Sequence, residues 1–255
     1  MELKDKIVFI TGASSGIGAA CARHFSRLGA KLLLCARRLE ALQEIITQCT
    51  NTQIHSFQLD VTQHDAIKKA FASLPDEWKK VDILINNAGL AAGLDFFQEG
   101  DINDWETMID TNVKGLLYVT KAVLPEMIAR NTGHIISIGS IAGHETYPKG
   151  AVYCATKAAV NVISQGLRMD LSGKNIRVST VDPGAVETNF SRVRFKGDEK
   201  RAAAVYAGMQ PLTAEDIADA IVYCATRPAH VNVSEIIIMP TAQASATITH
   251  RDTSL

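Results

Sequence analysis

Long apolar runs, paired cysteines and blocks of one charge are all missing from this sequence, and each absence excludes a class of protein. No apolar run approaches the roughly 18 residues that a membrane-spanning helix needs. The five cysteines are odd in number and contain no CxxC pair, which argues against a disulfide framework and a cysteine zinc site. The formal net charge is −1 with no basic block, which argues against nucleic acid as a partner.

Signals for metal binding, export and domain division are missing as well. The seven histidines show no metal-ligand spacing, so we expect no metal site. Residues 1–6 contain no signal-peptide core, and the chain has no linker, repeat or low-complexity stretch. A hydrophobic content of 47% with 21% charged residues is typical of a globular protein. We therefore expect one domain over residues 1–255 that works in the cytoplasm.

Short apolar runs alternate with helical patterns along the whole chain. Nearly continuous apolar runs are typical of parallel strands that are buried on both faces. The alternation predicts an α/β fold, a single doubly wound parallel sheet of about seven strands with helices on both faces. The predicted strands are 6–11, 30–35, 54–59, 81–85, 134–139, 176–181 and 234–239, and the clearest helices end near residue 28 or span 104–130, 155–171 and 213–226.

A glycine-rich turn after the first strand indicates a phosphate site. Strand 6–11 is followed by Gly12-Ala-Ser-Ser-Gly-Ile-Gly18 and then by a helical pattern, the arrangement of a dinucleotide site. Gly12 allows the tight turn, and Gly16 lets the backbone approach a pyrophosphate at the helix N-terminus. The residues expected to hold the phosphates are Gly12, Ser14, Ser15, Gly16, Ile17 and Gly18.

The end of the second strand indicates which dinucleotide is bound. An acidic residue about 20 residues beyond the glycine turn normally binds the ribose 2′-hydroxyl of NAD. Ala36 stands at this position and is followed by Arg37 and Arg38. Because arginine offers a planar fork to phosphate, the pair predicts NADP(H) rather than NAD. The alternative is that the two arginines merely begin a solvated helix.

Polar residues also follow the next two strands. Asp60 and Val61 end the third strand, where a carboxylate could accept a hydrogen bond from the adenine amino group. Asn86 and Asn87 follow the fourth strand, where amide side chains can bridge neighbouring strands and leave room for a ligand. Since ligands of doubly wound sheets bind at the carboxyl ends of the strands, these features are expected on one side of the sheet.

A serine, a tyrosine and a lysine near the end of the fifth strand form a candidate catalytic group. Ser140 follows strand 134–139, and Tyr153 and Lys157, four residues apart, share one helix face. Alone, this spacing is as compatible with chance as with catalysis. Its place at the same sheet edge as the glycine turn favours proton transfer to a carbonyl. Asn112, in an apolar helix face, is either a structural bridge or the holder of a functional water.

Together these motifs resemble the short-chain dehydrogenase/reductase family. The matching motifs are TGASSGIG at 11–18, NNAG at 86–89, Asn112, Ser140, YxxxK at 153–157 and PG at 183–184. The resemblance implies that Tyr153 is the acid/base and that Ser140 hydrogen-bonds the substrate oxygen. It also implies that Lys157 binds the nicotinamide ribose and lowers the pKa of Tyr153, and that Asn112 positions a water. Lowering a tyrosine pKa from about 10 to about 7 takes roughly 4 kcal/mol.

The resemblance extends to the cofactor site and to the assembly. It implies that Thr188 contacts the nicotinamide carboxamide and that the protein is a homotetramer. The remaining residues expected against NADP(H) are Asn87, Ala88, Gly89, Tyr153, Lys157, Pro183, Gly184 and Val186.

A finer similarity concerns the substrate. The segments PGAVETNFSRVRFKGD at 183–198 and VNVSEIIIMPTAQA at 231–244 are similar to NADP-dependent 3-hydroxy acid dehydrogenases, which act on serine and allo-threonine. This similarity implies oxidation of a small 3-hydroxy acid, of the 3-hydroxypropionate type, or reduction of the matching 3-oxo compound. The alternatives are a general carbonyl, sulfoacetaldehyde or 3-oxoacyl reductase and, in another class, a non-catalytic dinucleotide sensor.

An acidic substrate requires a cationic partner. The polar segment 187–210 is expected to cover the site, and its Arg192 and Arg194 could clamp a carboxylate. Glu187 could receive a substrate amino group. The alternative is that the segment is a solvated loop. The residues expected against the substrate are Ser140, His144, Tyr147, Tyr153, Glu187, Arg192 and Arg194.

Overall fold

A computed structural model of the chain describes residues 2–50 and 52–252. Residues 1, 51 and 253–255 lie outside this description. They belong to the range 1–255 that was predicted to form a single domain, and residue 1 belongs to the N-terminal segment 1–6. No helix within the described residues is both long and apolar enough to cross a membrane.

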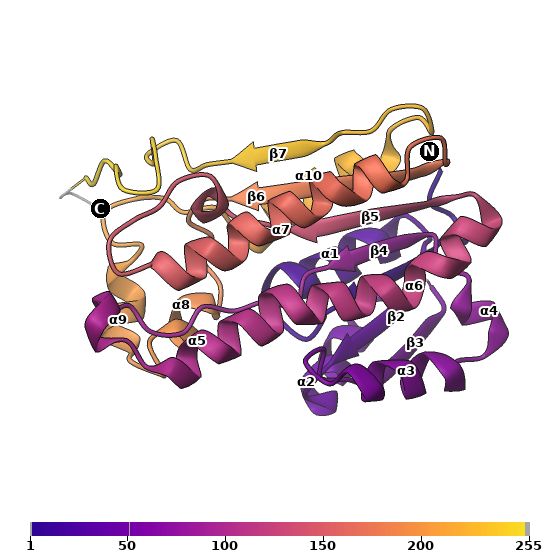
Figure 1. Cartoon of the computed structure of the whole chain (residues 1–255), viewed down its shortest axis with the longest axis horizontal. Coiled ribbons are helices and arrows are strands. Elements are labelled where there is room, and N and C mark those ends of the chain that lie inside the picture. Colours follow the sequence, from indigo (N-terminus) through magenta and orange to yellow (C-terminus); the bar gives the residue numbers. More distant parts are fainter. Residues whose placement is uncertain (1, 51, 253–255) are drawn as a thin grey trace.

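One seven-stranded parallel sheet organises the molecule, with helices on both faces (Figure 1). The strand order β3-β2-β1-β4-β5-β6-β7 reverses direction after β1, as in doubly wound sheets. The predicted fold class is therefore confirmed. The strands are β1 (Ile7–Thr11), β2 (Lys31–Ala36), β3 (Ile54–Gln58), β4 (Ile83–Asn86), β5 (Gly133–Ile138), β6 (Ile176–Pro183) and β7 (Glu235–Ile238).

Two helical layers cover the sheet. One layer contains α1, α2 and α10, and the other contains α3, α4, α6 and α7. The segment 187–210 that was expected to cover the site contains two short helices, α8 and α9. The helices are α1 (Gly16–Arg27), α2 (Leu39–Thr47), α3 (His64–Ser73), α4 (Asp76–Lys79), α5 (Ile102–Ile109), α6 (Leu116–Arg130), α7 (Ala151–Asp170), α8 (Phe190–Arg194), α9 (Glu199–Ala204) and α10 (Ala214–Thr226).

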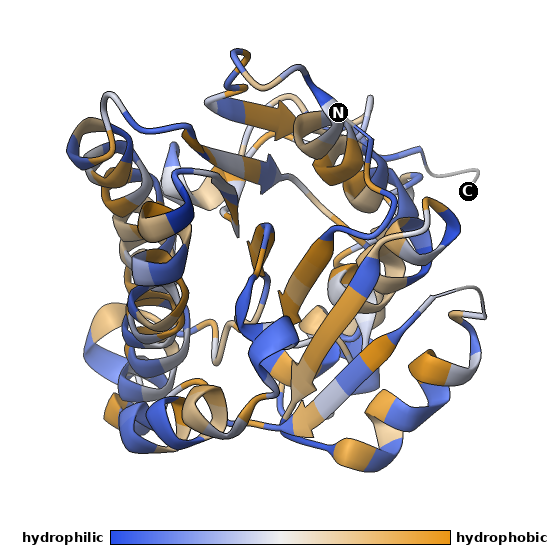
Figure 2. Ribbon diagram, turned by 90° about the vertical axis from the view of Figure 1, so that its right-hand side faces the viewer, coloured by the Kyte–Doolittle hydropathy of each residue, from blue (hydrophilic) through white to orange (hydrophobic). Residues whose placement is uncertain are grey.

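Each face of the sheet packs against a separate hydrophobic core. Both faces of central strands such as β1 and β2 are therefore apolar, which explains the continuous apolar runs in the sequence. On β1, Val8 and Ile10 point into the core under α1 and α10, whereas Phe9 points into the opposite core. On β2, Leu34 and Leu33 divide between the two cores in the same way. All five side chains are fully buried. Figure 2 shows these apolar strands enclosed by helices with polar outer surfaces.

Two predicted helices have different boundaries in the structure. Helix α7 begins at Ala151, four residues before the predicted start, so it contains Tyr153 within its first turn. The predicted helix 104–130 begins at Ile102, where the Asp101 side chain accepts a hydrogen bond from the Asn103 backbone N–H. It is also interrupted by a π-helical segment, η2 (Asp110–Gly115), between α5 and α6.

The C-terminal tail crosses the molecule to the α9 region. The Asp252 backbone N–H donates to the Gly208 carbonyl at 2.7 Å. The Arg251 guanidinium donates to the carbonyls of Val205 and Ala207. The tail therefore holds the loop that leaves α9.

Candidate active site

Ser140, Tyr153 and Lys157 come together at the carboxyl end of β5. All three side chains are buried. The Ser140 hydroxyl accepts a hydrogen bond from the Ala142 N–H at 3.1 Å and donates to the Pro183 carbonyl at 3.4 Å. These bonds fix the serine between the ends of β5 and β6.

The electrostatic surroundings of Tyr153 differ from expectation. Burial raises the pKa of the Tyr153 hydroxyl, and nearby Tyr147 raises it further. The nearby Ser140 hydroxyl and the Arg194 guanidinium lower this pKa, but less than burial raises it. The chain's own groups therefore do not bring the tyrosine pKa towards neutrality.

Lys157 lies on the same face of α7, one turn after Tyr153. Its Nζ is 6.0 Å from the centre of the Tyr153 ring and donates to the Ile138 carbonyl at 2.8 Å. Burial lowers the pKa of Lys157 to about 8, and the charge of Asp182 opposes that shift. The lysine side chain is therefore held by the β5 backbone.

Asn112 forms a structural bridge. It lies in the π-helical segment η2 and is buried. Its Oδ1 accepts from the Leu90 N–H, and its Nδ2 donates to the Leu90 carbonyl, both at 2.8 Å, and to the Thr156 hydroxyl at 3.1 Å. A Cβ on Gly89 would lie 3.2 Å from Asn112 Oδ1 and 3.6 Å from Lys157 Nζ. The predicted role of Asn112 in holding a water stays a prediction.

The glycine turn is built for close backbone contact. The Asn87 Nδ2 donates to the carbonyls of Thr11 and Gly12 at 2.8 and 3.1 Å, so the ends of β4 and β1 are joined. Gly12 has φ +64°, and a Cβ on Gly18 would lie 2.5 Å from both Asn87 Nδ2 and the Gly12 oxygen. Only glycine fits at Gly18, because such a contact is shorter than any packing distance.

The N-terminus of α1 fits a dinucleotide phosphate. Its N-cap residue, Ser15, makes no side-chain capping bond, and its first turn contains no acidic residue. The orphan N–H groups of this twelve-residue helix are therefore available to an anion. Gly16 has φ +54°, and a Cβ there would lie 3.5 Å from Thr188. The loop after β6 thus lies over the predicted pyrophosphate turn, which also contains Ser14 and Ile17.

The end of β2 carries two exposed guanidinium groups. Arg37 and Arg38 form no ion pair with any residue in 2–50 or 52–252. At the end of the adjacent β3, Asp60 Oδ1 accepts from the Thr62 N–H and hydroxyl at 3.0 and 2.8 Å. Val61 is buried. This edge suits the 2′-phosphate of NADP(H), because the Arg37 and Arg38 guanidinium groups are free to bind it. Asp60 is an anion and does not contribute to phosphate binding.

The remaining predicted cofactor residues lie at the same edge. The Ala88 N–H donates to the Thr11 hydroxyl at 3.0 Å. The Gly184 N–H donates to the Ile238 carbonyl at 2.7 Å, and Val186 forms an isolated parallel bridge with Leu212. Pro183 ends β6.

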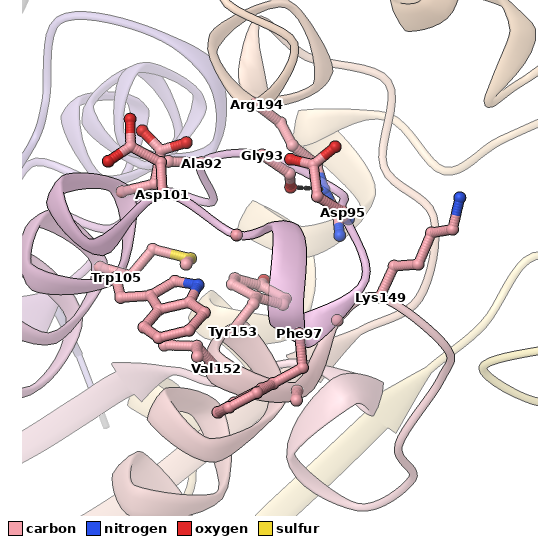
Figure 3. A pocket seen from close by; sticks show the side chains of 15 residues that line it. Ala92, Gly93, Asp95, Phe97, Asp101, Trp105, Lys149, Val152, Tyr153 and Arg194 are labelled. Atoms are coloured by element: carbon pink, nitrogen blue, oxygen red, sulfur yellow. Dashed lines mark hydrogen bonds between the residues drawn. The ribbon is translucent and has the colours of Figure 1, made fainter.

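A pocket opens beside Tyr153 between α5, α7 and α8 (Figure 3). The Arg194 guanidinium carbon lies 5.7 Å from the centre of the Tyr153 ring and 5.4 Å from that of Tyr147. Arg194 Nε donates to the Gly93 carbonyl at 3.2 Å, and the Gly93 N–H donates to the Arg194 carbonyl at 3.0 Å. Other polar and aromatic residues that line the pocket are Asp95, Phe97, Asp101, Asp104, Trp105 and Lys149.

Of the predicted substrate residues, Tyr153 and Arg194 line this pocket. Ser140 and Tyr147 lie close to them without lining it, and Arg192, Glu187 and His144 are not brought to it. Arg192 is exposed, and its Nε lies 2.8 Å from Glu199 Oε1. Glu187 is exposed at the surface. His144 lies 3.4 Å from Asp182. Arg192 and Arg194 are two residues apart on one helix and therefore face different sides, which only the structure could assign.

The opposite wall of the pocket was not predicted. It comes from the loop and helix after β4, where Asp95, Asp104 and Trp105 lie. Gly93 has φ +70°, and a Cβ there would be 3.1 Å from the Oδ2 atoms of both Asp95 and Asp104. A sequence signal did exist, because this segment directly follows the asparagine pair at a strand's carboxyl end.

Comparisons with known proteins agree with this geometry. Residues 6–199 match the family model described as short chain dehydrogenase. The chain is 48% identical over 241 residues to the NADP-dependent 3-hydroxy acid dehydrogenase YdfG of Shigella flexneri, covering 94% of this chain and 97% of that one. It is 46% identical to sulfoacetaldehyde reductase 2 of Chromohalobacter salexigens, covering 96% and 99%. A solved structure of the closed form of serine dehydrogenase complexed with NADP+ matches with a TM-score of 0.91 and 48% identity, covering 96% of this chain and 100% of that one.

Proposed function

The chain belongs to the short chain dehydrogenase family, and from that premise we propose that it transfers a hydride between NADP(H) and a small 3-hydroxy acid or its 3-oxo counterpart. The observation that carries this proposal is the position of Arg194, whose guanidinium lies beside Tyr153 in the pocket. A cation next to a proton donor suits a substrate that has a carboxylate close to its hydroxyl or carbonyl group. The names of the two similar dehydrogenases support the same substrate class.

The cofactor, when bound, supplies or accepts the hydride. The uncapped N-terminus of α1 would hold its pyrophosphate. Arg37 and Arg38 would hold the 2′-phosphate, since both are exposed and have no competing ion pair in the described chain. The expected preference for NADP(H) follows from these unpaired charges.

The proton is handled by the chain itself. We propose that the Tyr153 hydroxyl donates a proton to the substrate oxygen in reduction and takes it back in oxidation. Ser140, whose hydroxyl is fixed between Ala142 and Pro183, would orient that oxygen. Lys157, as a buried cation on the same face of α7, would favour the tyrosinate form. The burial of all three limits their contact with bulk solvent.

The pocket suits a substrate with charges of both signs. Arg194 would take the carboxylate through two hydrogen bonds. Asp104 is paired with Lys196 at 3.0 Å, whereas Asp95 forms no ion pair within the described residues. Asp95 is therefore available to a substrate ammonium group. This arrangement favours a hydroxy amino acid, serine or allo-threonine, over an uncharged alcohol.

Tyr153→Phe is the direct test. With serine, 3-hydroxypropionate, 3-hydroxybutyrate and sulfoacetaldehyde as substrates and both cofactors, the protein should prefer NADP(H) and turn over the carboxylated substrates. The variant should lose at least about a hundredfold in kcat, because it lacks the proton donor. It should still quench or enhance NADPH fluorescence on binding. Retained turnover would remove Tyr153 from the mechanism, and the absence of turnover in the parent protein with all four substrates would overturn the substrate class.

Sulfoacetaldehyde is a second candidate because a sulfonate could occupy the Arg194 position and a similar protein is a sulfoacetaldehyde reductase. The substrate panel separates the two. If sulfoacetaldehyde gives the higher kcat/KM, Asp95 has no ammonium to bind, and Asp95→Asn should then leave kcat/KM unchanged.

We also propose that the protein is a homotetramer. Val162 and Met169, seven residues apart on α7, are 66% and 67% exposed, so they form one apolar stripe. Ile102 and Ile109 repeat this spacing on α5. Two further exposed apolar side chains, Tyr223 on α10 and Ile237 on the edge strand β7, form a second apolar face. Two separate apolar faces on one chain suit two different two-fold interfaces, as in tetramers with three two-fold axes.

We also propose a cytoplasmic location, which the state of the cysteines supports. The five cysteines are all free and buried within the described residues, as is common where thiols are kept reduced. Cell fractionation with an antibody against the protein would test this location, and recovery in an extracellular fraction would contradict it.

A further inference from the structure

His144, Asp182 and Glu235 form a side-chain cluster beyond the catalytic group. They come from three elements: the loop after Ser140, strand β6 and strand β7. His144 Nε2 lies 3.4 Å from Asp182 Oδ2 and 3.5 Å from Glu235 Oε1. The three ligand atoms all lie within 4.8 Å of one another. The cluster has no part in the reaction derived above.

The carboxylate of Asp182 is the unusual member of this cluster. Its side chain is 0% exposed, and neither oxygen accepts a well-formed hydrogen bond, although the His144 ring lies 3.4 Å away and the Thr180 side chain is also nearby. A buried carboxylate without such partners is costly unless a cation or a proton compensates its charge. Its position is built into the backbone, because a Cβ on Gly139 would lie 1.6 Å from Asp182 Oδ1. The chain therefore holds an incompletely satisfied anion against a glycine.

The two separations between His144 and the carboxylates fit the coordination shell of zinc, and the two carboxylates lie within 4.8 Å of each other. Zinc–ligand bonds of about 2.1 Å in tetrahedral geometry place ligand atoms roughly 3.4 Å apart. The two distances from His144 Nε2 agree with that value. Octahedral magnesium requires shorter separations, of about 3.0 Å, and prefers oxygen ligands throughout. One imidazole with two carboxylates is also a donor set that suits zinc.

Asn161 on α7 offers a fourth ligand. Its Nδ2 lies 3.0 Å from His144 Nε2, and its Oδ1 is buried without a hydrogen-bond partner. Because amide oxygen and nitrogen are assigned from their surroundings, turning the amide over would place Oδ1 at 3.0 Å from the imidazole. We propose that His144, Asp182, Glu235 and Asn161 bind one zinc ion.

Such a site would be structural. Four protein ligands leave no open position for a water or substrate, as in closed zinc sites. The ion would join β6, β7, α7 and the loop after Ser140. Two carboxylates would neutralise its charge, so the buried Asp182 would no longer be an uncompensated anion. We therefore expect zinc to raise the thermal stability of the protein.

The test uses untagged full-length protein, stripped with EDTA, dialysed and titrated with Zn²⁺ by calorimetry. We expect one Zn²⁺ per chain, and binding at least a hundredfold weaker in His144→Ala and Glu235→Gln. Both substitutions are at exposed positions, so the variants should fold. The matched control is His64→Ala, because His64 lies 3.7 Å from Asp65 in a pair without a third ligand. His64→Ala should bind like the parent protein.

Two further readouts make the outcome decisive. Co²⁺ should give the intense visible absorption of tetrahedral coordination in the parent protein but not in His144→Ala. Zn²⁺ at a hundredfold excess over its Kd should raise the Tm by about 5–10 °C, and His144→Ala should lose this shift. The proposal is wrong if the stripped protein binds no stoichiometric Zn²⁺, or if His144→Ala binds it as tightly as the parent protein does. Neither result bears on hydride transfer, because neither measures turnover.

Discussion

Arg194 and Arg192 stand on the same short helix and have opposite surroundings. Arg194 lies over two tyrosine rings in the pocket, whereas Arg192 is 62% exposed and paired with Glu199. A half-buried cation that faces a substrate anion contributes more than a surface ion pair does. The two residues therefore form a matched pair for testing the pocket.

Arg194→Ala should raise KM for serine about 10- to 100-fold, because a charged hydrogen bond contributes about 1.5–3 kcal/mol. Arg192→Ala should change KM by less than about twofold, because surface ion pairs contribute little. Steady-state kinetics with serine and with a neutral ketone would measure both effects. Equal losses for the charged and neutral substrates would mean that Arg194 does not bind the carboxylate.

The charge of Lys157 gives a pH prediction. Burial lowers its pKa to about 8, so the lysine loses its charge as the pH rises through about 8. We expect affinity for NADPH, followed by fluorescence between pH 6 and 9, to fall over that interval. Lys157→Met should flatten the profile, and a parallel fall in this variant would assign the titration to another group. For stability the sign is opposite, because a lysine pKa depressed by folding makes unfolding harder as the pH rises from about 8 towards 10.5.

The sequence could indicate individual candidate residues only where their spacing along the chain already places them close together. Tyr153 and Lys157 share a helix face, and their spacing became informative once the glycine turn was expected at the same sheet edge. His144, Asp182 and Glu235 are far apart in the sequence and meet only because β6 and β7 are neighbours, and for that reason no ligand spacing was visible. The predicted role of Lys157 in lowering the Tyr153 pKa stays a prediction, and the burial that raises this pKa leaves no signal in the sequence.

At the scale of elements, the residue at which a helix starts is determined by nearby capping side chains. The position at which a helix is interrupted is not. Helix α10 begins with a capping box, in which the Thr213 hydroxyl accepts from the Asp216 N–H and the Asp216 carboxylate accepts from the Thr213 N–H. The π-helical segment η2 has no such local signature. It carries Asn112, whose three hydrogen bonds all reach outside the helix. The π-helical segment therefore coincides with hydrogen bonds from Asn112 to distant parts of the chain, and a sequence pattern cannot reveal such bonds.

Thr213→Ala should lower the free energy of unfolding by about 1 kcal/mol, because it leaves an N–H of the first turn of α10 without its acceptor. We expect kcat to stay unchanged, since α10 lies on the sheet face away from α7. Chemical denaturation would measure the loss. The control is Thr50→Ala at an exposed turn, and an equal loss there would show that the cap contributes nothing specific.

At the scale of the molecule, the doubly wound topology was predictable because both faces of the sheet are buried. That burial made the strands continuous apolar runs, and the alternation with helices then left one architecture. The pocket wall at Asp95 and Trp105 was not predictable, because it depends on how the loop after β4 packs against α8. Loop packing of this kind leaves no periodic pattern in the sequence.

The apolar stripe on α7 leads to a prediction about assembly. Val162→Glu combined with Met169→Glu should break a four-chain particle into smaller species, because two charges would be buried in the interface. Size-exclusion chromatography with light scattering would measure the mass against the 27.6 kDa of one chain. The control is Lys68→Glu on the exposed face of α3, which should leave the mass unchanged. A parent protein that is already monomeric would contradict the proposed tetramer.

The bonds from Arg251 and Asp252 to residues 205–208 link the chain terminus to the segment that carries Arg194. An exopeptidase that digested the tail past these residues would remove the restraint on that segment without touching any group that meets the substrate. Loss of Arg251 and Asp252 would thus loosen the segment that covers the pocket, and we expect KM for the substrate to change although no side chain that meets the substrate is removed.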